Sequence, residues 1–358
     1  EEKRDRALAL NREIWSWAEL NFREEKSAKA LADALEQEGF TVERNAAGMR
    51  TAFVASYGSG RPVIGILGEY DALSGLSQQA CRTSPQPLKE GGSGHGCGHN
   101  LLGAGSLAAA AAIKDYLEKK GGSGTVIFYG CPAEEQITGK RFMARGGAFK
   151  ECDFTVAWHP GASSQNTLGV MNGLEGAIFK FSGKTAHAAM NPQDGRSALD
   201  AVQLMNIGSE FLREHVTDDV RIHYAILDGG RAPNIVPDSA CVKYFVRALS
   251  REAILDAFDR VVKCAEGAAH MTDTTLEIER LGGIYPTLQN TVLAKAMQEA
   301  REEIPTVAWT EEEKKFADEI NRTSPLYEQD TPPFDDAVRP LAHNNGFAST
   351  DYGDVMHI

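Results

Sequence analysis

The sequence predicts an α/β fold in which a mostly parallel sheet flanked by helices is interrupted by a smaller ferredoxin-like domain. Three short, continuous apolar runs are typical of buried parallel strands, and helical or polar segments separate them. From Glu175 onward the pattern changes to β-α-β-β-α-β, the ferredoxin-like order. We therefore expect a discontinuous first domain, residues 1–174 and 284–358, and an inserted second domain, residues 175–283.

The first domain begins with two helices. Apolar side chains recur at helical spacing over residues 5–38, with a break at Asn21-Phe22, and Gly39 ends the second helix. Residues 76–98 form a long polar loop, and loops of this length close to a site tend to be functional. The remaining predicted elements are strands near 50–57, 62–67, 125–130 and 154–158 and a helix over 101–119.

The second domain is bounded by glycines, Gly173 before it and Gly282-Gly283 after it. Helical character resumes at Asn290, whereas residues 302–345 are poorly patterned and remain unassigned. Its predicted elements are strands at 176–182, 221–227, 239–248 and 274–281 and helices at 196–215 and 250–270.

Composition is that of a globular enzyme or binding protein. The chain has 358 residues, of which 42% are hydrophobic and 24% charged, so a large core is available. Its formal net charge of -13 argues against nucleic-acid or anionic-membrane partners. No apolar run approaches 18 residues, no signal peptide is visible, and six scattered cysteines favour a reducing compartment. We expect a cytoplasmic protein.

The segment Gly94 to Asn100 (GHGCGHN) carries metal-ligand chemistry. Cys97 and His99 are separated only by Gly98, so both side chains can converge on one ion. A thiolate and an imidazole suit a borderline-soft ion such as zinc. By itself, a Cys-Gly-His triplet is more typical of a glycine-rich turn with a buried thiol.

Further polar clusters follow the predicted strands. Asp71 comes after the run at 62–67, Glu134 and Glu135 come after 125–130, and His159 comes after 154–158. In open α/β sheets the carboxyl ends of the strands are where sites form. One glutamate of the pair can bind metal while the other faces a bound water. Alone, paired glutamates are usually a solvated surface, Asp71 a turn acid and His159 a histidine satisfied by backbone.

The chain resembles the aminoacylase/carboxypeptidase-type family of two-metal amidohydrolases, and within it the branch of the B-type aminobenzoyl-glutamate hydrolase subunits. The resemblance extends to about Leu281 and returns at the end of the chain. The motifs that carry it, in family order, are Gly68 to Leu73 (GEYDAL), Gly94 to Gly103 (GHGCGHNLLG), Pro132 to Glu135 (PAEE), Trp158 to Pro160 (WHP), Gly183 to Ala189 (GKTAHAA) and Ala348 to Val355 (ASTDYGDV).

The resemblance implies two divalent ions, zinc or manganese. It makes Cys97 the ligand shared by both ions, His99 and His159 ligands of one, and Glu135 a ligand of the other. It makes Glu134 the general base, which takes a proton from water and returns it to the leaving nitrogen. Asp71 is expected to orient a ligand imidazole.

The resemblance also makes the second domain a lid and dimerisation domain. It implies that His187 reaches across a dimer to stabilise the oxyanion, and that Asn234 and Arg247 bind the carboxylate of the substrate. Without the resemblance, a loop histidine such as His187 has no role and a strand-end arginine is a surface charge.

The sequence departs from the family pattern in two places. Relatives continue past Val355 and place a last histidine ligand there, whereas this chain stops at Ile358, and His357 lies too close to the motif to be the obvious replacement. We expect a chain ending at Ile358 to hold one ion well and the other poorly. The segment Gln136-Ile137-Thr138 replaces glycine-rich sequence, so that loop is expected to differ in shape or order.

The sequence thus predicts a metallo-amidohydrolase that cleaves small N-acyl amino acids or dipeptide-like substrates. Aminobenzoyl-glutamate is the first choice of substrate, and a dipeptide with an amine-bearing residue is the second. The expected assembly is a homodimer, or a dimer with a related subunit, without nucleic-acid or membrane partners. One alternative is a catalytically impaired member that binds ligands. Another is a redox thiol at Cys97, which the absence of a Cys-x-x-Cys pair disfavours.

Overall fold

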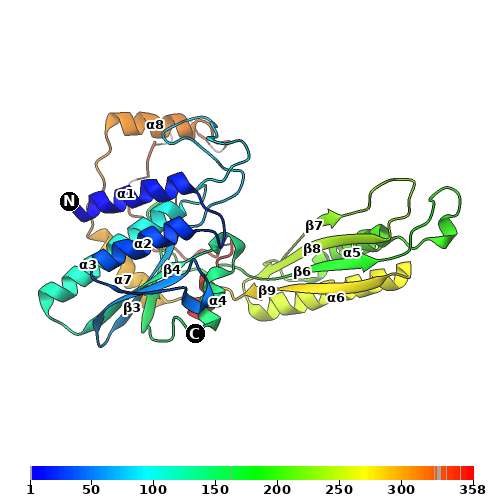
Figure 1. The fold of residues 1–358 in the computed structure, drawn as a ribbon, viewed down its shortest axis with the longest axis horizontal. Helices are drawn as coiled ribbons and strands as arrows, with labels where there is room; N and C mark the ends of the chain where they lie inside the picture. Colours follow the sequence, from blue (N-terminus) through cyan, green and yellow to red (C-terminus); the bar gives the residue numbers. More distant parts are fainter. Residues whose placement is uncertain (1, 162, 326, 329–331, 336, 347) are drawn as a thin grey trace. The chain divides into compact units, whose positions relative to one another are not determined.

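Figure 1 shows the computed structural model, which describes residues 2–161, 163–325, 327–328, 332–335, 337–346 and 348–358. The chain divides into two compact units. Unit 1 comprises Glu1–Leu168, Asn290–His343 and Ile358, and unit 2 comprises Gly169–Gln289 and Asn344–His357.

The sheet of unit 1 has five strands in the order β1-β2-β4-β3-β5 and is mixed, not mostly parallel as the sequence predicted. Short connections explain the difference, since only residues 60–62 join β2 to β3 and reverse the chain, whereas a parallel crossover needs a dozen residues or more. β3 (Val63–Glu69) pairs parallel with β4 (Gly124–Cys131) and β5 (Phe154–Val156), whereas β2 (Phe53–Ser59) pairs antiparallel with both β1 (Thr41–Arg44) and β4.

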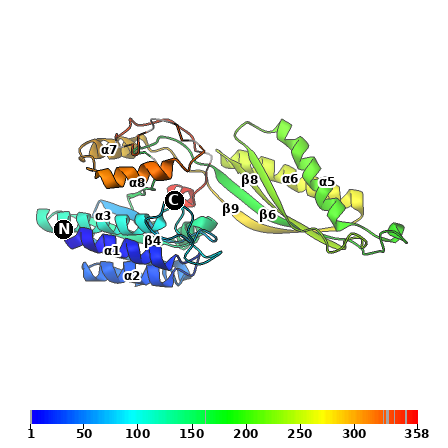
Figure 2. The same cartoon turned by 90° about the horizontal axis from the view of Figure 1, so that it is seen from above.

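Three helices, α1 (Glu2–Trp17), α2 (Glu25–Gln37) and α3 (His99–Lys120), lie against one another and cover one face of this sheet (Figure 2). Val126 and Phe128 of β4 are fully buried against these helices. Tyr129, the next residue, points to the opposite face, where its ring packs on Phe149 with centroids 4.6 Å apart. The alternation along β4 therefore gives unit 1 a core on both faces of its sheet.

The other helices of unit 1 are α4 (Gly139–Arg145), α7 (Thr291–Glu302) and α8 (Glu311–Asn321). α8 lies in the stretch that the sequence left unassigned and begins at a capping box formed by Thr310 and Glu313. Within the described part of the chain, no helix is both long and apolar enough to cross a membrane.

Residues 173–284 of unit 2 form elements in β-α-β-β-α-β order, and the bounds of these six elements agree with the predicted segments to within a few residues. Unit 2 also includes Asn344–His357, which the sequence analysis placed in the first domain. Its sheet is antiparallel, in the order β7-β8-β6-β9. Phe179, Tyr244 and Phe258 are fully buried in its core. Its elements are β6 (Gly173–Ser182), α5 (Ala198–Leu212), β7 (Arg221–Asp228), β8 (Ser239–Ala248), α6 (Arg251–Thr272), β9 (Thr275–Ile284) and α9 (Tyr352–Met356).

Gly139, the first residue of α4, lies directly against the backbone that leaves β4. A Cβ atom added at Gly139 would lie 1.6 Å from the carbonyl oxygen of Pro132. We expect Gly139→Ala to destabilise the fold by about 1–3 kcal/mol, as overpacking does, and to lower the Tm measured by circular dichroism. Gly122→Ala is the control, because nothing lies within 4 Å of a Cβ atom there. Equal Tm values for the two variants would contradict the expectation.

Candidate metal centre

The polar clusters that follow β3, β4 and β5 gather at one edge of the sheet in unit 1. The three strands are parallel neighbours, so their carboxyl ends meet at the same edge. The loop before α3 supplies another cluster to this edge. The predicted site residues found there are Asp71 after β3, Glu134 and Glu135 after β4, His159 after β5, Cys97 before α3 and His99 as the first residue of α3.

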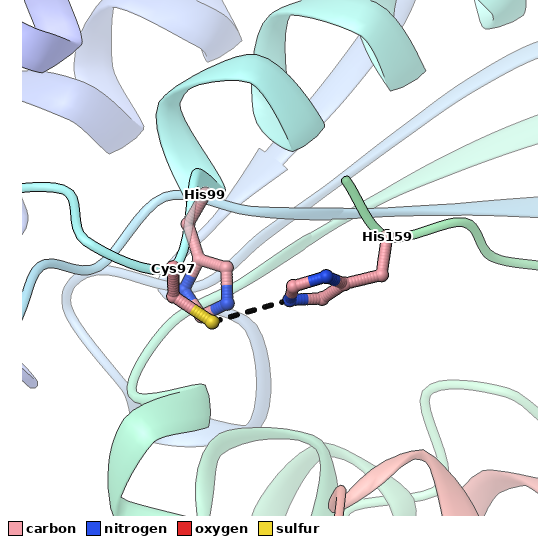
Figure 3. A group of neighbouring side chains, drawn as sticks. All are labelled: Cys97, His99 and His159. Atoms are coloured by element: carbon pink, nitrogen blue, oxygen red, sulfur yellow. Dashed lines mark hydrogen bonds between the residues drawn. The ribbon is translucent and has the colours of Figure 1, made fainter. Parts of the chain in front are cut away.

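Cys97, His99 and His159 lie close enough to share one ion (Figure 3). The Cys97 Sγ atom is 3.2 Å from Nε2 of His159, and one ligand atom from each of the three side chains lies within 4.8 Å of the others. Gly98 adopts a left-handed conformation (φ 82°) between Cys97 and His99, which favours glycine. The backbone turn at Gly98 therefore brings both neighbouring side chains to the site.

Asp71 orients the ring of His99. The fully buried Asp71 carboxylate accepts a hydrogen bond from Nδ1 of His99 at 2.9 Å, which leaves Nε2 as the nitrogen that can bind metal. Among the described residues, Nε2 of His99 has no hydrogen-bond partner although it is buried. A buried nitrogen without a partner is costly, so its position fits a metal ligand.

Glu134 and Glu135 lie on a 3-10 turn, η2 (Glu134–Gln136), with one oxygen each near His99. Oε2 of Glu134 is 4.0 Å from Nε2 of His99, and Oε1 of Glu135 is 3.9 Å from Nδ1. The Glu135 Oε1 atom is also buried, with no hydrogen-bond partner in the described part of the chain. Ile137 ends the turn at φ 55°, a conformation that a β-branched residue adopts only with strain.

The site side chains pair with one another, and this pairing changes their pKa values. The hydrogen bond with His159 lowers the pKa of the Cys97 thiol, and the same bond raises the pKa of His159 to about 9. Burial lowers the pKa of His99, but the hydrogen bond with Asp71 and the nearby Cys97 and Glu69 side chains outweigh it and raise the pKa to about 11. Near pH 7 both imidazoles of the metal-free protein therefore carry protons that a bound metal would displace.

These observations fit a divalent metal. A thiolate, two imidazoles and a carboxylate are ligands that such an ion takes in proteins, and two of the buried ligand atoms lack a hydrogen-bond partner among the described residues. Among the described residues, Cys97, His99 and His159 would hold one ion, and Glu69, His99 and Glu134 form a second group of converging ligand atoms; Glu135, the other ligand that the sequence predicts, lies in neither group.

The three remaining predicted residues lie in unit 2. His187 is exposed after β6, and its Nδ1 accepts the backbone N–H groups of Ala189 and Met190 at 3.2 and 3.1 Å. Its segment pairs with the one that holds Asn234, since the N–H of Ala188 donates to the carbonyl oxygen of Asn234. The structure therefore brings His187 and Asn234 into adjacent segments.

Arg247 lies on β8 and contacts the last motif of the chain. Its Nη1 donates to Oγ of Ser349 at 3.1 Å, whereas its buried Nε has no hydrogen-bond partner among the described residues. His357 packs on Tyr285, with its Nε2 3.0 Å from the carbonyl oxygen of Pro286.

Three buried charged residues around the site have no role in the sequence prediction. Glu69 Oε2 lies 3.2 Å from Nε2 of His99, an ion-pair contact without hydrogen-bond geometry, and Oε1 pairs with the fully buried Lys140 Nζ at 2.7 Å. Glu24 is fully buried at the start of α2, and burial raises its pKa to about 7. Glu69 was visible inside a motif, but no pattern marks Lys140 or Glu24 as buried.

Comparison with known proteins identifies the family. The sequence pattern of peptidase family M20/M25/M40 matches residues 65–319. The chain belongs to this family. It is 47% identical over 326 residues to the B-type subunit of p-aminobenzoyl-glutamate hydrolase from Escherichia coli (strain K12), covering 90% of this chain and 67% of that protein. The Xaa-Arg dipeptidase of Mus musculus is 31% identical, with coverage of 84% and 68%.

A solved structure of the same family shares the fold. It is a dinuclear metal binding M20 peptidase of Bacillus subtilis, with a TM-score of 0.64, 19% identity and coverage of 98% of this chain and 85% of that one. With this family membership, the chain is a metal-dependent M20 amidohydrolase that acts on amide bonds. These relatives are hydrolases and peptidases, so nothing in them favours the binding-protein alternative.

Metal binding should release protons. His159 and His99 are protonated in the metal-free protein below pH values of about 9 and 11, and each ring must be neutral to bind an ion. Affinity should therefore rise with pH below 9, with about two protons released per protein at pH 7.5. Calorimetric titration of chelator-treated protein with zinc, in buffers of different ionisation enthalpy, measures this number. An enthalpy independent of the buffer would contradict the prediction.

Proposed function

We propose that this M20 hydrolase cleaves the amide bond of an N-acyl glutamate of the aminobenzoyl-glutamate type. The observation that carries the proposal is the Glu134 carboxylate, whose Oε2 lies 4.0 Å from Nε2 of His99, beside the Cys97 cluster. The 47% identity to a p-aminobenzoyl-glutamate hydrolase subunit supports this substrate class. A dipeptide is the second candidate, supported by the 31% identity to Xaa-Arg dipeptidase.

In this proposal Cys97, His99, His159 and Glu135 hold the metal, and zinc or manganese occupies the site as a pair of ions. Cysteine thiolate and imidazole favour zinc, whereas a carboxylate is also acceptable to manganese. Asp71 holds His99 with Nε2 facing the site, through the hydrogen bond to Nδ1.

Glu134 performs the proton transfers. When bound, the ions would supply Lewis acidity that lowers the pKa of the attacking water and polarises the amide carbonyl. Glu134 accepts one proton from that water as the water oxygen forms a bond to the carbonyl carbon. Glu134 then gives the proton to the amide nitrogen, the C–N bond breaks, and a carboxylic acid and an amine result.

Residues 175–283, which lie within unit 2, are proposed to act as a ferredoxin-like lid and dimerisation domain, and residues 1–174 and 284–358 as the catalytic domain. The β-α-β-β-α-β order and the strand order β7-β8-β6-β9 support the ferredoxin-like assignment. The lid would contribute His187 to oxyanion stabilisation. The 47% identical relative is itself a subunit of a hydrolase, which supports a related partner chain as an alternative to a homodimer. The acidic composition and scattered cysteines support a cytoplasmic location.

Arg247 and Asn234 are proposed to bind the free carboxylate of the substrate. The Arg247 guanidinium has one contact fixed, to Ser349, and its Nε is a buried donor without a hydrogen-bond partner among the described residues. Carboxylate binding would satisfy it through the paired donors of arginine.

The two glutamates of the turn should have separable roles. Glu134→Gln should lower kcat by ~10²–10⁴-fold, the usual contribution of a general base, and leave the metal bound. Glu135→Ala should lose metal, measured by elemental analysis after dialysis. Gln136→Ala, at an exposed position on the same turn, is the control and should retain both. Near-wild-type turnover in Glu134→Gln with aminobenzoyl-glutamate would exclude Glu134 as the base.

Recognition of the carboxylate should depend on Arg247. Wild type should prefer aminobenzoyl-glutamate over its α-methyl ester, and Arg247→Ala should reduce this preference by raising KM for the free acid. His187→Ala should mainly lower kcat for both compounds. Lys243→Ala, on the same strand, is the control and should discriminate as wild type does. If Arg247→Ala discriminates against the ester as strongly as wild type, Arg247 does not bind the carboxylate.

A further inference from the structure

Glu24 is a buried carboxylate that takes no part in the proposed reaction. Its side chain is 0% exposed, and its Oε1 accepts the backbone N–H of Ala133 at 2.9 Å. Ala133 directly precedes Glu134. Burying a carboxylate is unfavourable unless hydrogen bonds compensate. The hydrogen bond from Ala133 therefore helps to keep Glu24 buried, and it ties Glu24 to the backbone beside Glu134.

The turn that carries Glu134 holds an unfavourable backbone conformation. Ala133 before it and Ile137 after it are both left-handed, with φ of 54° and 55°, which non-glycine residues rarely adopt. Inside the turn, the N–H of Ile137 donates to the carbonyl oxygen of Glu134. Such conformations persist only where the surrounding structure holds them.

Two buried carboxylates hold this turn from outside, one at each glutamate. Glu24 accepts the N–H of Ala133, next to Glu134, and Oδ2 of Asp71 accepts the N–H of Glu135 at 2.9 Å. Glu24 comes from the start of α2 and Asp71 from the end of β3. The two amides are therefore anchored to different elements of unit 1.

Glu19, which also lies just before α2, is a carboxylate with a structural role and serves as a comparison for Glu24. Its two oxygens accept the backbone N–H groups of Lys26 and Ser27 at 3.1 and 2.9 Å, in the first turn of α2. Glu19 thus caps a helix. The side chain of Glu24 instead reaches outside the helix, to the amide of a residue 109 positions away.

We propose that Glu24 is a positioning residue for Glu134. By fixing the amide of Ala133, Glu24 holds the left-handed backbone that aims the Glu134 carboxylate at the reacting groups, while Asp71 does the same for Glu135. This inference rests on the proposed role of Glu134 as the base. Loss of the Glu24 contact then lowers kcat and leaves KM and bound metal unchanged, because Asp71 still holds Glu135 and the ligands Cys97, His99 and His159 lie outside this turn.

Three substitutions at Glu24 separate its acceptor from its charge. Glu24→Gln keeps an oxygen at the same reach and should retain kcat within about threefold. Glu24→Asp withdraws the acceptor from Ala133, and Glu24→Met removes it, so both should lower kcat by ~10–10²-fold, as expected for a misplaced catalytic group. The measurements are kcat and KM for aminobenzoyl-glutamate, metal equivalents by elemental analysis, and Tm. If Glu24→Met does not fold, Glu24→Asp still gives the comparison.

Glu19→Ala is the matched control. It should lower Tm by removing the cap of α2 and leave kcat within about twofold of wild type. Near-wild-type kcat in folded Glu24→Asp or Glu24→Met would overturn the inference, as would equal losses in Glu24→Gln and Glu24→Met. A kcat loss that follows lost metal would also overturn it.

Glu134→Gln, measured in parallel, separates this inference from the proposed function. An inactive Glu134→Gln beside an active Glu24→Met refutes only the role of Glu24. An active Glu134→Gln refutes the proposed base and the inference together.

Discussion

The carboxylate of Asp71 joins the parts of the metal centre. Its Oδ1 accepts from Nδ1 of His99 and its Oδ2 accepts from the backbone N–H of Glu135, both at 2.9 Å, and the side chain is fully buried. One rigid group at the end of β3 therefore sets the direction of an imidazole on α3 and of the turn after β4. Charge-assisted hydrogen bonds of this kind are short and directional, so the arrangement of the ligands follows from where β3 ends.

Local patterns explain why much of the fold and site could be predicted from the sequence. The apolar runs that form β3 and β4 are continuous because both faces are buried, and the polar residues Asp71, Glu134 and Glu135 follow the ends of these strands. In unit 2, alternating burial along β8 gives a periodicity that the sequence shows directly. The short motif around Cys97 and His99 needs only one left-handed glycine to bring two side chains together.

Features that depend on distant pairing could not be predicted. The strand order is one such feature, since β4 lies between β2 and β3 although only residues 60–62 join those two strands. Lys140 is fully buried because it meets Glu69, and Glu24 is buried because it meets Ala133, 109 residues further along the chain. Lysine and glutamate are typical surface residues, so their burial is a property of the folded contacts and not of their local sequence.

Charge balance connects these buried groups to metal binding. Glu69, Asp71, Glu134 and Glu135 lie around His99, and like charges this close destabilise one another unless cations are near. Lys140 pairs with Glu69 and so compensates one carboxylate. Glu69 and Asp71 raise the pKa of His99, and Glu69 also raises the pKa of His159. The same negative charge attracts a divalent ion. Protons and metal ions therefore compete for the same two imidazoles, those of His99 and His159. The ion binds where the pH is high enough for these imidazoles to lose their protons.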